Sequence, residues 1–501
     1  MKLKNLTIAL IAATVPTTGV FAAALDRSGQ SISAFLQPNN YFEAGISVLD
    51  PTVEGKEAGT SESRKNIGDM GDDYYFPSAA IKLQLADKVS FGLLYDQPFG
   101  ADAAYHGDNV FVSNSSNTIL GSDSMAAIRT RTIESTFSGL SAQQRVGAYL
   151  QSQNVDLTTA AGQQRLANTL AVYNADAATK AAIDAGVKQG VTSRVDAGIA
   201  QANSTLGKGN TKVEVDTQNL SMIFGYQPTK NFNVYAGGVY QTIKGNVSLR
   251  GQAYSLYNGY DASIKETGGT GWLAGAAFQI PEIALKASVT YRSEIDHDVD
   301  VDESLSALGA LSLLGPTGAT TAANIANATG KTTITTPQSV NLDFQTGIMA
   351  NTVAFANLRW VNWKDFSIQP LKFGKVSEAV GGLIGKPNGF NLVEYSDDQY
   401  TATVGVGRKL NEQWAGNVSV GWDSGAGNPV TTLGPTEGYW NVGLGVQYSP
   451  TPSTFIAGGV KYFWLGDAKA QTGAQAGTNQ YVADFTDNNA LAYGLKLGYR
   501  F

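Results

Sequence analysis

The chain has 501 residues, of which only 15% are charged, with 56 glycines, 10% aromatic residues and no cysteine. Without cysteine it can hold neither a disulfide framework nor a thiolate-bound metal or redox centre. The net charge of −7 is modest and spread along the chain, which argues against nucleic acid as a partner.

The N-terminus has the pattern of a secretory signal peptide. Two lysines precede an apolar run over residues 6–15, and alanines occupy residues 22–24. The run is too short to cross a bilayer of about 30 Å as a helix. We predict a signal peptide over residues 1–22, with residue 24 as the alternative end, and a short luminal segment over residues 23–40.

From residue 41 onward, segments of about ten residues alternate between apolar and polar positions, and turn residues separate them. No stretch reaches the roughly 18 apolar residues that a spanning helix needs. We therefore predict an all-β, transmembrane antiparallel barrel over residues 41–501. Its fourteen strands are expected near residues 41–49, 76–85, 89–98, 213–226, 232–246, 270–280, 283–295, 333–349, 353–368, 396–409, 413–424, 437–448, 454–466 and 485–501.

The strand near 413–424 shows the expected membrane pattern. Trp414 and Trp422 end one apolar face, opposite small and polar residues. We expect these two rings to lie in the two interfacial aromatic girdles. Short links between strands should be periplasmic and long ones extracellular, with both chain termini in the periplasm.

One connection, from about residue 101 to 210, is far longer than the others. Its alanine-rich composition predicts helices, one after Ser141 through Tyr149, one after Thr158 or Thr159 through Tyr173, and one from Asn174 to about Gly190. This extracellular insertion is either a solvated cap or a cap that collects substrate or binds a partner. A second extracellular loop is predicted over residues 305–331.

The last strand alternates apolar and small or polar residues and ends at Phe501. A terminal aromatic residue with Tyr499 before it resembles the signal read by the barrel-assembly machinery of Gram-negative outer membranes. We expect Tyr499 and Phe501 to serve as that assembly signal.

Several segments together resemble the long-chain fatty acid transporter family of outer-membrane proteins. They are Leu25-Asp-Arg-Ser-Gly-Gln, residues 42–51, Phe76-Pro-Ser-Ala-Ala-Ile-Lys-Leu, residues 89–100 and Arg359-Trp-Val-Asn-Trp-Lys-Asp-Phe. The resemblance implies a monomeric fourteen-stranded barrel in the outer membrane, in contact with its lipids and lipopolysaccharide, that needs no cofactor. It also implies passive transport of long-chain fatty acids or similar hydrophobic compounds, such as aromatic hydrocarbons.

Family members carry an N-terminal hatch in the lumen and release substrate through a lateral opening beside a kinked third strand. Here the predicted third strand ends at Gln97, Pro98, Phe99 and Gly100, where proline removes a ladder donor and glycine permits a bend. These four residues are the candidates for the opening, unless the proline simply ends the strand. The hatch of this chain is shorter than usual, and only Gln37-Pro-Asn-Asn resembles the family's Asn-Pro-Ala turn.

The inward faces of the predicted strands carry more cations than carboxylates. The cations are Lys82, Lys286, Arg292, Arg359, Lys461, Lys496 and Arg500, against Glu43, Asp96, Asp343 and Asp423. Such a lining would attract a fatty acid carboxylate. We select Arg359 and Lys461, with the neighbouring Phe455 and Phe463, as substrate-binding candidates; the alternative is that these charges pair with one another.

An enzyme is not expected. The only two histidines, His106 and His297, lie in predicted loops without a recognisable catalytic motif, and no zinc-ligand spacing is present. The alternatives to hydrophobic transport are a general diffusion porin and an adhesin-like surface barrel.

Overall fold

The computed structural model describes residues 25–501, except 115–116, 120–121, 205, 307, 310, 312–315 and 383–384. The predicted signal peptide lies outside the described residues.

Fourteen antiparallel strands form a single barrel in which each strand pairs with the next one along the chain. The pairing of β9 with β10 closes the barrel. The strands are β1 (Tyr41–Thr52), β4 (Tyr74–Ala86), β5 (Val89–Asp96), β9 (Lys212–Tyr226), β10 (Phe232–Leu249), β11 (Tyr260–Ile280), β12 (Leu285–Arg292), β16 (Ser339–Met349), β17 (Thr352–Val361), β20 (Gln399–Lys409), β21 (Trp414–Asp423), β23 (Tyr439–Thr451), β24 (Thr454–Leu465) and β27 (Asn489–Arg500). The last strand pairs with the first along its whole length. The predicted fold class and strand count are therefore confirmed.

The outer face of the wall is apolar, because alternate side chains point away from the lumen. Trp422, Trp440 and Trp464 are cross-strand neighbours and are 37%, 57% and 50% exposed. At the other end of the same strands, the exposed ring of Trp414 lies 4.8 Å from the half-buried ring of Tyr448. The two predicted aromatic girdles are thus present, with apolar residues between them.

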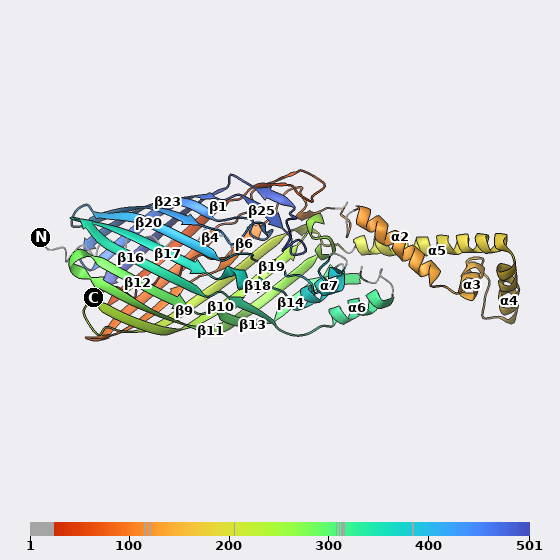
Figure 1. Ribbon diagram of the computed structural model, residues 1–501, viewed down its shortest axis with the longest axis horizontal. Coiled ribbons are helices and arrows are strands. Elements are labelled where there is room, and N and C mark those ends of the chain that lie inside the picture. The colour runs from red at the N-terminus through yellow and green to blue at the C-terminus, as the bar shows by residue number, and fades with distance from the viewer. Residues whose placement is uncertain are drawn as a thin grey trace.

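Short and long connections lie at opposite ends of the barrel. Figure 1 shows the C-terminus at the end opposite helices α2–α5. At the long-loop end lie the shorter strands β2 (Gly55–Glu57), β3 (Asn66–Ile67), β6 (Gly100–Ala104), β7 (Val112–Ser113), β8 (Gly209–Asn210), β13 (Ile295–Val299), β14 (Val301–Leu305), β15 (Thr332–Thr336), β18 (Ser367–Ile368), β19 (Val393–Glu394), β22 (Val430–Thr431), β25 (Ala468–Gln471) and β26 (Ala483–Phe485). The 3-10 turns are η3 (Gln252–Tyr257), η4 (Pro281–Ile283) and η6 (Trp363–Asp365), and two more helices are α6 (Pro316–Ala326) and α7 (Leu371–Gly381).

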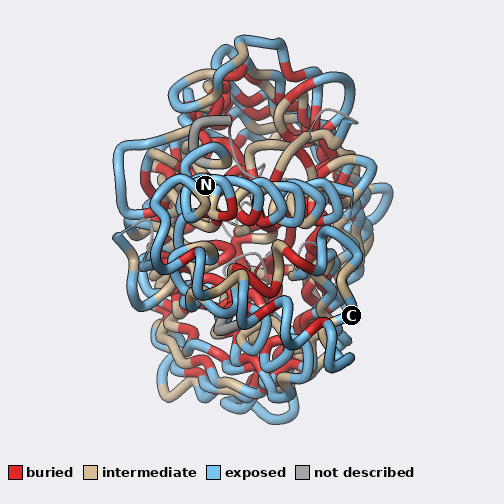
Figure 2. Tube along the Cα trace, turned by 90° about the vertical axis from the view of Figure 1, so that its right-hand side faces the viewer, coloured by how far each residue is buried: buried red, intermediate tan, exposed pale blue. Residues whose placement is uncertain are grey.

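The long insertion forms helices α2 (Ser122–Ser138), α3 (Ala142–Ser152), α4 (Ala160–Ala175) and α5 (Ala177–Ser204), which project away from the barrel (Figure 1). Ser141 caps α3 through a capping box and Thr159 caps α4, as the sequence predicts. The third predicted helix is longer than expected, because α5 continues to Ser204. The helices nearest the viewer in Figure 2 are exposed along most of their length and buried along one side.

Other strand boundaries also differ from the sequence prediction. The segment expected as one strand over 333–349 is divided into β15 and β16, because Pro337 between them has no amide to donate. The strand expected to reach 368 ends at Val361, where η6 follows. The loop over 305–331 contains α6. Among the described residues, no helix is both long and apolar enough to cross a bilayer.

Candidate functional site

Residues 25–40, called here the N-terminal segment, lie inside the barrel. Its backbone carbonyls accept hydrogen bonds from inward-facing cations of two strands. Lys286 Nζ donates to Leu36 O at 2.8 Å, Lys82 Nζ donates to Asn39 O at 2.8 Å, and Arg292 Nη2 donates to Gln30 O at 3.3 Å. These cations therefore hold the segment, since a charged donor strengthens each bond.

A buried ion pair fixes the start of the segment. Arg359 Nε donates to Asp26 Oδ2 at 2.7 Å, and the two side chains are only 3% and 6% exposed. The other guanidinium nitrogens donate to Asp26, Gly29 O, Gln30 Oε1 and Asn341 Oδ1. Every nitrogen of this buried cation is thus satisfied, as a buried charge requires.

Phe35 anchors the middle of the segment in the wall. Its ring lies 5.6 Å from that of Tyr235, edge to face. A Cβ on Gly92 would lie 2.4 Å from Phe35 Cδ2, and one on Gly225 would lie 2.8 Å from Phe35 Cζ. The two glycines therefore leave room in β5 and β9 for this ring.

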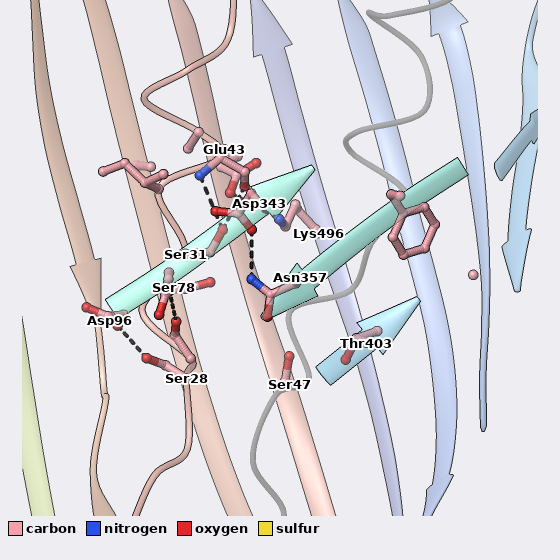
Figure 3. A pocket seen from close by; sticks show the side chains of 18 of the residues that line it. Ser28, Ser31, Glu43, Ser47, Ser78, Asp96, Asp343, Asn357, Thr403 and Lys496 are labelled. Atoms are coloured by element: carbon pink, nitrogen blue, oxygen red, sulfur yellow. Dashed lines mark hydrogen bonds and ion pairs between the residues drawn. The ribbon is translucent and has the colours of Figure 1, made fainter. Parts of the chain in front are cut away.

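The N-terminal segment separates two spaces in the lumen. The lower chamber, of about 260 Å³, has a mixed lining with more apolar than polar surface, and its polar residues include Ser47, Ser78 and Thr403. Figure 3 shows Asn357 directed at Asp343 and Ser28 at Asp96 in this chamber. The upper cavity, of about 40 Å³, lies on the loop side and is lined mostly by apolar side chains: Leu25, Leu49, Val213, Val215, Val247, Ile264, Ile368, Leu392 and Leu433.

Strand pairing in the barrel wall is interrupted beside β5, and this interruption is called here the wall gap. β4 and β5 pair only from Ala86↔Val89 to Ala79↔Tyr95. Beyond that point, residues 74–78 of β4 keep their pairing with β1 but have no strand pairing on the other side. Backbone pairing with the following chain resumes at the bridge between Gly71 and Ala103, and within the gap the Tyr74 hydroxyl hydrogen-bonds with the backbone of Asp102.

The four candidate residues for a lateral opening lie at this gap. β5 stops at Asp96 and the chain resumes as β6 at Gly100, so Gln97, Pro98 and Phe99 break the strand. Pro98 O accepts from the amide of Arg27 at 2.7 Å, and the amide of Gly100 donates to Leu25 O at 2.9 Å. The N-terminal segment thus takes the backbone bonds that β4 would otherwise make.

Arg27 lies at the edge of the gap and lines both spaces. Its guanidinium carbon lies 4.0 Å from the centroid of the Tyr74 ring on β4. A Cβ on Gly100 would lie 2.2 Å from the same carbon. The guanidinium therefore lies between β4 and β6, on the two sides of the wall gap.

The inward cations have partners. Arg359 pairs with Asp26, and Lys496 Nζ lies 3.0 Å from Glu43 Oε1. These two cations thus pair with carboxylates of the protein, which is the alternative to substrate binding given above. The Arg359 guanidinium is therefore already occupied by Asp26. Lys461 lines the lower chamber.

The structure does not bring the two candidate phenylalanines together. Phe455 belongs to the buried apolar cluster around Tyr41, whose ring lies 6.3 Å away. Phe463 belongs to a different cluster toward the loop end and contacts Tyr439 at 5.2 Å. The four substrate-binding candidates therefore do not form one site.

Sequence reasoning missed Asp26, Arg27 and Phe35. All three belong to the short segment that precedes the first strand, where no periodicity assigns a face. The one signal was the charged pair Asp26-Arg27 within an otherwise uncharged stretch.

The two aromatic residues of the expected assembly signal stack at the end of the last strand. The rings of Tyr499 and Phe501 lie 5.4 Å apart, and both are about half exposed on the outer face. Of the two histidines, His106 is exposed and His297 is buried beside Gln241. Within the described residues, no group of three or more potential ligands could hold a metal ion.

Comparison with known proteins gives one family. The sequence matches, over residues 99–501, the family described as outer membrane protein transport protein (OMPP1/FadL/TodX). No curated protein matches the sequence.

Two solved structures show the same fold. A FadL homologue of Pseudomonas aeruginosa is 12% identical, with a TM-score of 0.55 over 94% of this chain and 92% of that one. The toluene transporter TbuX of Ralstonia pickettii is 10% identical, with a TM-score of 0.50 over 98% of each chain. At these identities the likeness concerns architecture alone.

Proposed function

This chain belongs to the OMPP1/FadL/TodX family of outer membrane transport proteins, and from that premise we propose a route through it: a hydrophobic molecule enters from the loop side along the apolar lining of the upper cavity, passes Arg27 and leaves sideways through the wall gap. The membership itself places the chain in the outer membrane of a Gram-negative bacterium as a channel for hydrophobic compounds, and not as an enzyme. It favours such a channel over a general diffusion porin or an adhesin. Long-chain fatty acids and aromatic hydrocarbons are the two substrate classes to be distinguished.

The observation that carries the proposal is the wall gap. Continuing the register of Ala79↔Tyr95 would place Pro77 opposite Gln97, and Phe76 opposite Pro98. Each edge of the gap thus contains a proline, which has no amide proton to give to a neighbouring strand. The interruption of backbone pairing is therefore caused by a proline on each side of the gap, and does not depend on one flexible side chain.

The positions of the two spaces also favour this route. The upper cavity includes Tyr74, Gly100 and Ala101 in its lining, and the lower chamber reaches Pro77, Ser78 and Gln97. Both spaces therefore touch the gap, from the loop side and from the periplasmic side, with Arg27 between them.

An axial exit would be costly for an apolar molecule. It would have to cross the lower chamber, whose wall carries Asp96, Asp343 and Lys461. Each methylene group that met water or these charged groups in place of an apolar surface would cost about 0.8 kcal/mol. A lateral exit delivers the molecule directly to the hydrocarbon layer and avoids most of this cost.

The test places a large side chain at the gap and compares it with the same side chain across the chamber. Ser78 lies on β4 at the gap, and Thr403 on β20 lines the same chamber (Figure 3). Ser78→Trp should block uptake of a hydrophobic compound by intact cells, whereas Thr403→Trp should leave it largely unchanged. Heat-modifiable migration on a gel would verify that both variants assemble. Equal inhibition by the two substitutions would support axial passage and refute the lateral route.

The strand break can also be tested with Pro98→Val, which supplies an amide opposite β4 and should reduce uptake. The companion change Gly100→Ala is not informative, because its Cβ would displace the Arg27 guanidinium.

We further propose that the barrel functions as a monomer. Its exposed apolar band would contact outer-membrane lipids and lipopolysaccharide, and the barrel-assembly machinery would insert it through the terminal strand. Normal activity of a protein that migrates as a single barrel in detergent would support the monomer.

A further inference from the structure

Tyr74 makes a side-chain link across the wall gap. Its hydroxyl donates a hydrogen bond to Asp102 O at 2.6 Å and accepts one from Asp102 N at 2.7 Å. Asp102 belongs to β6, which pairs with β9 from Gly100 to Ala104. One phenol oxygen thus takes both backbone bonds that a paired residue of β4 would make, since a hydroxyl can donate and accept at the same time.

This link divides the wall gap into two parts. Backbone pairing is present at the bridge between Gly71 and Ala103 on the loop side, and again from Ala79 onward on the periplasmic side. At about 3.3 Å for each extended residue, Tyr74 lies ~10 Å from the first and ~17 Å from the second. Tyr74 also lines the upper cavity. The upper cavity therefore meets the gap at the Tyr74 side chain.

The link can open without loss of the barrel. Tyr74 is the first residue of β4, and its pairing with Leu49 is the last one between β4 and β1. A side-chain hydrogen bond at the end of a strand can break alone, whereas a bond inside a backbone ladder breaks only together with its neighbours. The contact of Tyr74 with Asp102 is therefore the part of the wall that can open and close reversibly.

The surrounding residues favour the closed arrangement. The guanidinium carbon of Arg27 lies 4.0 Å from the centroid of the Tyr74 ring, and the guanidinium also hydrogen-bonds with the Tyr74 hydroxyl. The ring of Phe76 stacks beside the Tyr74 ring, with the centroids 6.1 Å apart. Asp102 O otherwise accepts a long bond of 3.5 Å from the amide of Asp72. Because backbone groups away from water need partners, loss of the Tyr74 bonds is unfavourable at rest.

We propose that Tyr74 is the latch of the wall gap: its hydroxyl closes the passage between the upper cavity and the gap, and both bonds with Asp102 break each time a substrate leaves. This inference rests on the proposed function, since it assumes the lateral route. The latch responds to the opening of the wall and not to the chemistry of the substrate. Tyr74 is thus a positioning residue that controls the rate of exit.

The test measures the uptake of N-phenyl-1-naphthylamine, a hydrophobic dye that fluoresces in hydrocarbon, by intact cells with the full-length chain in their outer membrane. Tyr74→Phe removes the hydroxyl and keeps the ring against Arg27 and Phe76. It should raise the uptake rate by about 5- to 100-fold, the range for the loss of two hydrogen bonds. A rate equal to that of the parent, or below it, would overturn the inference.

The matched control is Tyr257→Phe. It is the same substitution at another buried tyrosine, whose hydroxyl donates to Phe373 O at 3.0 Å where η3 meets α7. The uptake rate of this variant should equal that of the parent, and heat-modifiable migration should show that both variants assemble. Equal acceleration by the two substitutions would indicate general loosening of the loop end and would overturn the inference.

Two further measurements locate the path that Tyr74→Phe opens. Adding Ser78→Trp should cancel the gain, because the large ring fills the gap; a gain that persists would place the path elsewhere and overturn the inference. A cysteine at Ala34, in the middle of the N-terminal segment, should be alkylated equally fast with and without Tyr74→Phe. Faster alkylation would attribute the gain to release of the segment, and would also overturn it.

The single variants separate the latch from the route. If Ser78→Trp slows uptake and Tyr74→Phe does not raise it, the lateral route stands and the latch is refuted. If Ser78→Trp alone leaves uptake unchanged, the proposed function itself fails, and the latch fails with it.

Discussion

Replacing Arg359 with glutamine should release the N-terminal segment while the barrel stays closed. The substitution leaves Asp26 as a buried carboxylate without its cation, and it also removes the donors to Gly29, Gln30 and Asn341. Removing one partner of a buried ion pair costs about 3–5 kcal/mol. Each 1.4 kcal/mol changes an equilibrium constant about tenfold. The fraction of molecules in which the N-terminal segment has left its site should therefore rise by ~10² to ~10⁴, up to complete opening.

The absence of cysteine from the chain allows a clean measurement. Ala34 is 5% exposed in the middle of the segment, so a cysteine placed there reports on opening through its rate of alkylation by a small reagent. In the Ala34→Cys background, Arg359→Gln should accelerate alkylation by the factor given above. Unfolding of the barrel, followed by heat-modifiable migration, should not accompany the change.

Two variants make the result specific. Lys496→Gln breaks a buried ion pair within the wall, with Glu43, and should leave alkylation at residue 34 unchanged. Adding Asp26→Asn to Arg359→Gln should slow alkylation again, because the orphaned charge is removed. An alkylation rate equal to that of the parent in Arg359→Gln would refute the idea that this pair holds the segment.

Two further predictions concern the ends of the molecule. Deleting Phe501 should impair assembly and leave unfolded chain in the periplasm, because the ring that stacks on Tyr499 is lost; normal yields of heat-modifiable barrel would contradict this role. Replacing residues 128–198 with a short Gly-Ser linker should preserve both assembly and uptake of a hydrophobic compound, because α3–α5 have their own apolar core around Val146, Leu150 and Tyr173. A large loss of uptake with normal assembly would instead place substrate contacts on these helices.

The barrel could be predicted from the sequence because the pattern that specifies it lies within each single strand. In a membrane wall, every second side chain meets lipid, so the period of two and the aromatic ends of each strand are visible in segments such as Trp414–Trp422. The same reasoning locates the turns and the helices after Ser141 and Thr159, where a cap and its neighbours lie within a few residues. The strand break at Pro98 was visible for the same reason, since proline removes a donor wherever it stands.

The site could not be predicted in this way, because its contacts join residues that are far apart in the chain. From the sequence, Arg359 is predicted to be an inward cation that could bind a substrate carboxylate. In the folded chain, Asp26, which is 333 positions away, pairs with it instead. Nothing in the sequence pairs Pro77 with the region of Pro98 until the register of β4 and β5 is known. Sequence periodicity thus determined which strand residues face the lumen, and only the folded chain decided which of their charges are neutralised, as Arg359 is by Asp26 and Lys496 is by Glu43.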